Sequence, residues 1–367
     1  MGPRVRCNRF LDFMKALTLL LVFGLSNSSS ALNEIFDTYH SAACLAQGNA
    51  CTASISGYAS HFYNPAGLAR FNKKKNEVHL VVAEGHANGA GFGRITESKS
   101  FGTYRMFPLL RENPGDYHFF ALNSLPSFTI RNFSFALLGN YQFAAVSDGT
   151  NLDIDTRQDL VPTVGISRHF AGNLLRLGVS VKAVYRNQMQ GVITHSALEV
   201  PDNQFSALSR EGLGFSLDTG MMLTLPYRFV PTLGIAWNNM GTTTFQGMKF
   251  LNTQAQGAPS KIPQSFHAGF SISPMLNRAW KSVFSVDYRH IELTQLPWKK
   301  HFHLGWELTL DKTLFIWTGL NQMLLTGGVG LRIQGGHLEV GTYSKDIGEN
   351  ETLTGDRRYF CRYTISF

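Results

Sequence analysis

The stretch Tyr359-Phe360-Cys361-Arg362-Tyr363-Thr364-Ile365-Ser366-Phe367 closes the chain with an apolar side chain at every second position. Successive side chains of a β-strand point to opposite faces. One face is therefore apolar, whereas Arg358, Arg362, Thr364 and Ser366 share the other face with a lone phenylalanine, Phe360. Such a strand fits a barrel wall between lipid and a wet lumen. The alternative is the edge strand of a soluble sandwich. We favour the membrane wall, because a long apolar edge in a soluble protein invites aggregation.

The first 31 residues have the features of a secretory signal peptide. Basic residues precede a short apolar core, Ala16–Leu25, and Ser29 and Ala31 supply the small residues of a cleavage site. The core is too short for a spanning helix, which needs about 20 apolar residues. We therefore expect the mature chain to begin near Leu32. Without residues 1–31 the 33 basic and 25 acidic residues become 29 and 24, so the net charge falls from +8 to +5 and gives no indication of nucleic-acid binding.

Apolar residues are abundant but dispersed. Hydrophobic residues make up 44% of the chain and 35 residues are glycine, yet the mean hydropathy is only −0.08. After residue 31 no apolar run is long enough for a transmembrane helix. Cys361 lies on the apolar face of the last strand, where we expect a lipid-facing filler. Cys44 and Cys51 are seven residues apart and could pair in an oxidising periplasm, which sequence alone leaves open.

Alternating segments separated by turns recur along the chain. They predict strands at 133–146, 160–170, 174–187, 212–225, 229–239, 262–273, 281–290, 300–310, 313–320, 325–334, 337–345 and 357–367. One strand near 76–85 and a long one near 117–130, kinked at Pro126, bring the count to about fourteen. It becomes sixteen if 89–94 and 99–107 also enter the wall.

The connections alternate between two classes. Tight turns, such as Asp311-Lys312 and Gly335-Gly336, separate longer polar segments. The longer segments are 147–159, 188–211, 240–261, 291–299 and 346–356, with a short link at 321–324 among them. Short turns on one rim and long loops on the other are typical of outer-membrane barrels. We therefore predict an all-β fold, a transmembrane antiparallel up-and-down barrel formed by residues 76–367.

The inner face of this wall carries frequent charges. We assign seven side chains to the lumen: Asp287, Arg289, Glu307, Arg332, Glu339, Arg358 and Arg362. Their signs alternate enough for paired ladders, as in Arg332, Glu339 and Arg362. Bracing of a wet lumen is the interpretation we favour over a dedicated ion-selectivity device.

Residues 32–75 lack strand alternation and are rich in small residues, so they could fold into the barrel as a hatch. Here Ala59-Ser60 is followed by Asn64-Pro65-Ala66-Gly67-Leu68-Ala69, where proline favours a turn. This stretch resembles the N-terminal motif of FadL-type outer-membrane transporters and of the related PorV-type barrels. The glycine-rich stretch 327–331 near the C-terminus is similar to a little-characterised branch of that superfamily. The resemblance assigns a hatch motif to Asn64, Pro65, Ala66 and Gly67.

The resemblance implies a fourteen-stranded barrel that moves hydrophobic molecules through a lateral opening. Small hydrophobic or amphipathic compounds would then be the ligands. Aromatic side chains are the candidate contacts: Tyr58, Phe62, Tyr63, Phe315, Trp317 and Phe360. Aromatics at such places more often pack a hatch against a wall than bind a ligand. The charged inner face is a departure from the apolar pocket that a carrier needs.

Further expectations follow from the resemblance and from missing motifs. The last strand resembles the signal that outer-membrane proteins offer to the insertion machinery, which assigns that role to Tyr363, Ile365 and Phe367. Outer-membrane lipid and this machinery would then be partners. PorV-type members serve protein secretion, so a structural or secretion-accessory barrel whose loops 188–211 and 240–261 bind proteins is the alternative function. We expect no enzyme and no cofactor, since no catalytic motif is present. His301 and His303 share a face but have no third metal ligand nearby in sequence.

Overall fold

The computed structural model describes residues 34–70, 77–98, 110, 114–130, 132–194, 207–274, 279–348 and 353–367. The expected signal peptide, 1–31, and the candidate strand at 99–107 lie outside these ranges. Among the described residues, no helix is long and apolar enough to cross a membrane.

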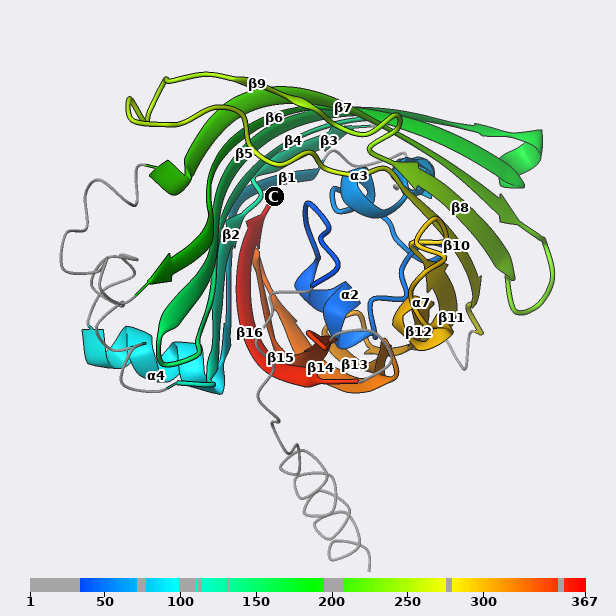
Figure 1. The fold of residues 1–367 in the computed structure, drawn as a ribbon. Helices are drawn as coiled ribbons and strands as arrows, with labels where there is room; N and C mark the ends of the chain where they lie inside the picture. Colours follow the sequence, from blue (N-terminus) through cyan, green and yellow to red (C-terminus); the bar gives the residue numbers. More distant parts are fainter. Residues whose placement is uncertain are drawn as a thin grey trace, which may run out of the picture.

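Antiparallel strands form a single sheet that closes on itself, because β1 pairs with both β16 and β2 (Figure 1). The strands are β1 (Glu77–Asn88), β2 (Tyr117–Ser124), β3 (Ser127–Ile130), β4 (Phe133–Ser147), β5 (Asn151–Phe170), β6 (Leu175–Thr194), β7 (Ser209–Thr224), β8 (Thr232–Asn238), β9 (Phe245–Gly247), β10 (Ser265–Ile272), β11 (Trp280–Arg289), β12 (Phe302–Leu310), β13 (Leu314–Asn321), β14 (Leu324–Ile333), β15 (Gly336–Asp346) and β16 (Gly355–Ser366).

The wall has fourteen strand positions. β2 and β3 share one position between β1 and β4, and β9 only extends the edge of β7, so the sixteen strands of the sheet fill fourteen places. The break between β2 and β3 falls at Pro126, where the sequence predicts a kink in one long strand. Residues 89–94, which would have raised the count to sixteen, instead belong to helix α4 (Gly89–Ser98). The prediction of fourteen strands is confirmed.

The predicted alternation of faces is also confirmed. On β7, Phe215 is 70% exposed on the outside, whereas its neighbour Ser216 is buried inside. On β16, Tyr359 and Tyr363 lie outside while Arg362 is buried. The final residue closes the ring, since Phe367 and Val78 exchange backbone hydrogen bonds of 3.0 and 3.1 Å.

Backbone conformation explains the tight turns. Asp311 and Lys312, between β12 and β13, have φ of 49° and 58°, which is the left-handed region that two-residue hairpin turns require. Gly335, between β14 and β15, has φ of 75°. The turn after β5 contains the short helix η2 (Ala171–Asn173). The short helix α7 (Trp298–His301) delays the start of β12 by two residues relative to the predicted strand at 300–310.

Two segments predicted as long loops, 147–159 and 188–211, are partly strand. β5 begins at Asn151 and β6 continues to Thr194, so 147–159 and 188–194 extend the wall. The outer face of this extension is not in contact with lipid, because Leu152 and Ile154 are buried in a cluster with Leu110 and Phe120. The alternation of lipid-facing and lumen-facing residues is therefore lost in this extension, which is why the sequence does not indicate a strand there.

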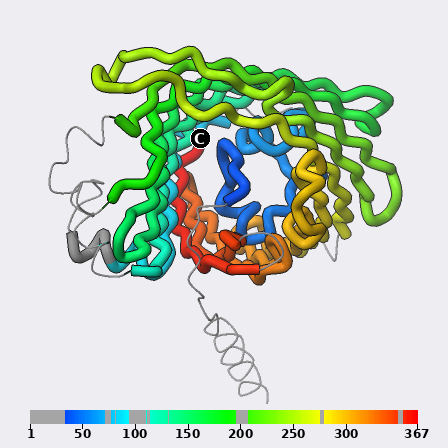
Figure 2. The backbone as a smooth tube through the Cα atoms, viewed as in Figure 1, coloured from blue at the N-terminus to red at the C-terminus, as the bar shows by residue number. Residues whose placement is uncertain are grey.

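Residues 34–70, which we call the hatch segment, lie inside the ring of strands (Figures 1 and 2). They form α2 (Ala42–Ala46), α3 (Ser60–Tyr63) and η1 (Pro65–Arg70). A disulfide joins Cys44 to Cys51, with their Cα atoms 5.9 Å apart. Cys361 is free and exposed on the outer face. The interior of the barrel is therefore occupied by the chain's own N-terminal part.

Candidate functional site

The hatch motif is held by backbone groups of the wall and of the hatch segment itself. The Asn64 amide nitrogen donates to the carbonyls of Thr52, Met221 and Ile235 at 2.9, 3.2 and 3.3 Å, and its oxygen accepts the N–H of Ala66 at 3.1 Å. Pro65, Ala66 and Gly67 begin η1, where all three are buried. Asn64 thus ties one turn of the hatch segment to β7 and β8.

Inward-facing glycines let the hatch segment approach the wall closely. A methyl group added at Gly234 would lie 2.6 Å from the Thr52 carbonyl oxygen, and one added at Gly178 would collide with the backbone of Pro65. We call the whole set the docking glycines: Gly165, Gly178, Gly220, Gly234, Gly269, Gly305 and Gly319. They come from β5, β6, β7, β8, β10, β12 and β13. Gly178, Gly234, Gly305 and Gly319 face hatch backbone, whereas a methyl group at Gly165, Gly220 or Gly269 would first meet side chains.

The aromatic side chains predicted as ligand contacts fall into two separate clusters. Tyr58, Phe62 and Tyr63 belong to the largest apolar cluster, between the hatch segment and the wall. Trp317 and Phe360 pack instead around α2, with Phe315 against them. The structure does not bring all six together into one cavity.

The two predicted lumen carboxylates Asp287 and Glu307 hold the hatch segment. Asp287 accepts the backbone N–H of Thr52 at 2.7 Å. Glu307 accepts the side-chain amide of Gln47 at 2.7 Å and the indole N–H of Trp317 at 3.0 Å. These carboxylates act as fixed anchors for the hatch segment.

The charges predicted as a ladder are only partly brought together. Arg362 and Glu339 form an ion pair at 3.3 Å. Arg332 does not join them: it is exposed near the turn that follows β14, 5.0 Å from the centre of the Phe315 ring. The remaining two, Arg289 and Arg358, are buried and pair with the hatch segment.

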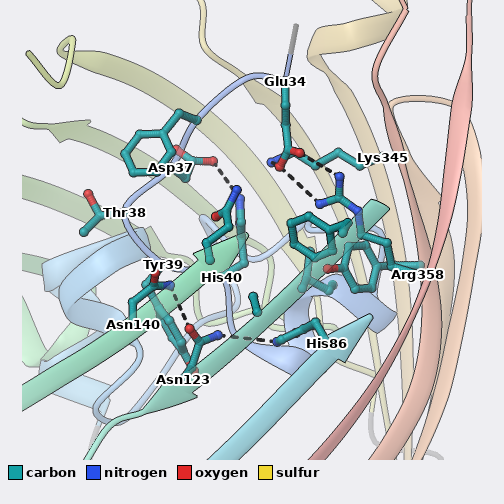
Figure 3. A pocket seen from close by; sticks show the side chains of 16 residues that line it. Glu34, Asp37, Thr38, Tyr39, His40, His86, Asn123, Asn140, Lys345 and Arg358 are labelled. Carbon is teal, nitrogen blue, oxygen red and sulfur yellow. Dashed lines mark hydrogen bonds and ion pairs between the residues drawn. The ribbon is translucent and has the colours of Figure 1, made fainter. Parts of the chain in front are cut away.

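The first described residues, 34–40, form an arm that lies across the lumen. Glu34 accepts two hydrogen bonds from Arg358, at 2.7 and 3.2 Å, and pairs with Lys345 at 2.5 Å (Figure 3). Asp37 pairs with Arg289 at 3.0 Å and with His290 at 3.3 Å. Because these partners stand on β15, β16 and the end of β11, the arm is fixed to two separate parts of the wall.

Electrostatics favour the ionised carboxylates of this arm. Burial alone would raise the pKa of Glu34, but Arg358 and Lys345 outweigh it and hold the pKa well below its usual range. For Asp37, His290 and Arg289 likewise outweigh burial and lower the pKa. Burial lowers the pKa of His40 to about 3, although Asp37 opposes this shift. Both carboxylates are therefore charged and His40 is neutral at neutral pH.

A small pocket, part of it open to solvent, lies between the arm and the wall (Figure 3). Polar side chains dominate its floor: Asn140 donates to Asn123 at 2.7 Å, and Asn123 donates to Glu84 at 2.9 Å. Phe36, Phe119 and Tyr343 add aromatic surface. Of the predicted site residues only Arg358 lines this pocket. The alternation of their strands places Asn123 and Asn140 on the inner face. This was the one sequence signal that could have indicated the pocket.

The wall is interrupted next to the apolar cluster. β1 pairs with β2 through residues 83–87 and with β3 through residues 77–79, and its residues 80–82 have no partner on this side. Opposite them lie Leu125 and Pro126, of which Pro126 lacks an N–H. We call this place the wall interruption. Val82 and Leu125, which belong to it, are buried in the same cluster as Tyr58 and Phe62.

Comparison with known proteins identifies the architecture. No family model and no curated protein sequence matches the chain. Among solved structures, the CymD monoaromatic hydrocarbon channel is similar over 92% of this chain and 99% of its own, with a TM-score of 0.56 and 12% identity. The toluene transporter TbuX of Ralstonia pickettii covers the same shares, with a TM-score of 0.54 and 14% identity.

A FadL homologue from Pseudomonas aeruginosa is similar over 92% of this chain and 98% of its own, with a TM-score of 0.51 and 11% identity. These neighbours are transporters and channels rather than enzymes. At such low identity the likeness establishes the fold. The chain therefore has the fold of the FadL-type outer-membrane transporters, a fourteen-stranded barrel with its N-terminal segment inside.

Proposed function

We propose that this chain is an outer-membrane barrel that passes small hydrophobic or amphipathic compounds inward, through the space between its hatch segment and β1–β4. We further propose that residues 1–31 are a cleaved export signal, and that Tyr363, Ile365 and Phe367 are read by the insertion machinery. The names of the neighbours, a toluene transporter and a monoaromatic hydrocarbon channel, support the class of compound.

One observation carries the proposal. The apolar cluster of the hatch segment lies directly behind the wall interruption, where Val82 and Leu125 are among its members. Tyr58 extends the contact to β1, with its ring 4.5 Å from that of His79. An apolar surface beside a gap in the hydrogen-bonded wall would let a hydrophobic molecule leave the lumen without crossing water.

The charged inner face does not oppose this route, because several of its buried charges are already paired. Arg186 donates two hydrogen bonds to Asp159, at 2.7 and 2.8 Å, and Lys182 pairs with Asp218 at 2.6 Å. Buried pairs of this kind cost much free energy to break. They brace the wall, and the hydrophobic compound is left to the separate apolar cluster.

Transport by the purified barrel in proteoliposomes tests the proposal. We expect Leu125→Gln to slow entry of toluene at least fivefold, because it places an amide at the wall interruption. Val184→Gln is the matched control, since Val184 is buried in the same cluster but lies on β6, away from the gap. Equal rates for both variants and the native barrel, or no transport by the native barrel, would contradict the proposal.

Nothing in the described residues favours the secretion-accessory alternative. Loop 240–261 is folded back on the wall, where the Glu211 carboxylate accepts the N–H groups of Phe250, Leu251 and Asn252 at 2.7 to 2.9 Å. Half of the other loop named for that role, 188–211, lies outside the described residues, namely 195–206.

A further inference from the structure

Three side chains from distant parts of the chain converge at the rim that carries the long loops. Asp37 comes from the arm, His267 from β10, and His290 follows the end of β11. One ligand atom from each lies within 4.8 Å of the other two. We propose that Asp37, His267 and His290 bind one divalent transition-metal ion of the zinc or nickel type.

The spacing of Asp37 and His290 suits such an ion. Two ligands placed 2.0 to 2.1 Å from a tetrahedral zinc ion lie about 3.3 to 3.4 Å apart. The Asp37 Oδ2 and His290 Nε2 atoms are 3.3 Å apart. The same Oδ2 lies 3.4 Å from Nε2 of His40, and both ring nitrogens of His40 lack a hydrogen-bond partner among the described residues. His40 or water can therefore take the fourth position.

Neighbouring groups already orient the two imidazole rings. Nδ1 of His290 faces Glu292 Oε1 at 3.5 Å, which leaves Nε2 directed at Asp37. Nε2 of His267 contacts the Ser265 hydroxyl at 3.0 Å, and its Nδ1 accepts the backbone N–H of His290 at 3.2 Å, so metal binding by His267 would replace one of these two contacts. Histidines that bind metals usually have their second ring nitrogen held by a carboxylate or another polar group.

The donor set and the local charge select the class of ion. Two imidazoles and one carboxylate suit zinc, nickel or copper better than magnesium or calcium. Asp37 and Glu292 supply two negative charges, whereas Arg289, which donates to Asp37 at 3.0 Å, supplies one positive charge. A divalent ion between Asp37 and His290 would fix the arm to β10 and β11. This site does not depend on what crosses the barrel.

The test uses the full-length barrel in detergent, purified with a tag that lacks histidine and stripped with a chelator. We expect calorimetry and elemental analysis to give one Zn²⁺ or Ni²⁺ per barrel. Asp37→Asn and His290→Gln should each weaken binding at least tenfold. His337→Gln is the matched control, because His337 lies 3.2 Å from Glu339 and belongs to no group of three ligands found among the described residues. It should change affinity less than twofold.

Two results would overturn the proposal: absence of stoichiometric binding by the native barrel, or equal affinity in the native barrel and both variants. The mobility of unboiled samples on SDS gels shows whether each variant has folded. Cobalt substitution of the native barrel needs no variant at all. It should produce the strong visible bands of a four-coordinate ion, and a spectrum of hydrated cobalt alone would also refute the site.

Discussion

The two sides of the barrel hold the hatch segment in different ways. On β6, β8, β12 and β13, docking glycines bring hatch backbone against wall backbone, and on β5, β7 and β10 they make room for side chains. On β1–β4 the contacts are made by side chains, such as Tyr39, whose hydroxyl donates to Glu84 at 3.2 Å. The described residues of β1–β4 include no inward-facing glycine, because Gly85 and Gly139 alternate with inward-facing neighbours such as Glu84 and Asn140. The pocket and the wall interruption both lie on this second side.

This difference indicates which side of the barrel can change its conformation. Backbone contacts through glycine leave no room for a sliding hatch, since protein interiors are close-packed. Side-chain contacts and ion pairs can be exchanged one at a time. We infer that any passage opens along β1–β4, while the hatch segment remains fixed to the opposite side.

The largest effect is expected where the backbones touch. Gly178→Val should destabilise the barrel by about 3 kcal/mol or more, because overpacking against backbone cannot be relieved by a rotamer change. Gly139→Val is the control, since a methyl group there would first meet an atom at 4.0 Å. Loss of SDS-gel mobility with temperature measures the difference. Equal melting of the two variants would mean that the docking glycines do not fix the hatch segment.

Loss of the disulfide should have the next largest effect. Replacing Cys44 and Cys51 with serine removes a cross-link that spans seven residues, which is worth about 2 to 3 kcal/mol by loop-closure entropy. We expect the hatch segment to become sensitive to protease while the wall stays closed. Cys361→Ser, on the outer face, is the control. Unfolding of the whole barrel in the double variant would show that the hatch segment and the wall form one cooperative unit.

The wall could be predicted because each strand repeats the same physical contrast. Lipid on one side and the lumen on the other select opposite residues at neighbouring positions, as at Phe215 and Ser216. The prediction failed where that contrast ends. Leu152 and Ile154 face outward into a protein cluster rather than lipid, so the start of β5 was mistaken for a loop.

The site was less predictable, because its contacts join distant residues. The hatch motif could be located from Asn64-Pro65, since it is local. Glu34 and Arg358, in contrast, are 324 residues apart and meet only when the ring closes. The same holds for the convergence of Asp37 with His267 and His290. Periodicity predicts which face a side chain occupies, whereas it cannot predict which segment fills the lumen opposite that face.

A smaller effect is expected on the side of exchangeable contacts. Glu34→Gln removes the negative partner of Lys345 and Arg358 and should loosen the arm by about 1 to 3 kcal/mol. Asp356 still pairs with Arg358 at 2.7 Å, which limits the loss. Proteolysis of the N-terminal arm should accelerate while the melting temperature of the wall hardly changes. Glu77→Gln, on the same side but outside the arm, is the control. An unchanged rate of arm proteolysis would mean that these ion pairs do not hold the arm.

The smallest effect on the stability of the arm is expected when mild acid protonates Glu34. Burial raises the pKa of Glu34, but Arg358 and Lys345 lower it by more than burial raises it. The pKa of Glu34 in the folded protein therefore lies below its pKa in the unfolded chain. A carboxylate of this kind stabilises the native state fully above the unfolded pKa of about 4.3. The contribution begins to fall as the pH drops below that value and is gone once the pH is below the lower, folded pKa. The loss is about 0.4 kcal/mol at pH 4.3 and grows by about 1.4 kcal/mol per pH unit below it. Arm proteolysis by an acid-active protease should therefore accelerate between pH 5 and pH 3 in the native barrel more than in Glu34→Gln. Parallel pH profiles for the two proteins would show that the arm is held by its other contacts, and the side facing β1–β4 would then be as fixed as the side with the docking glycines.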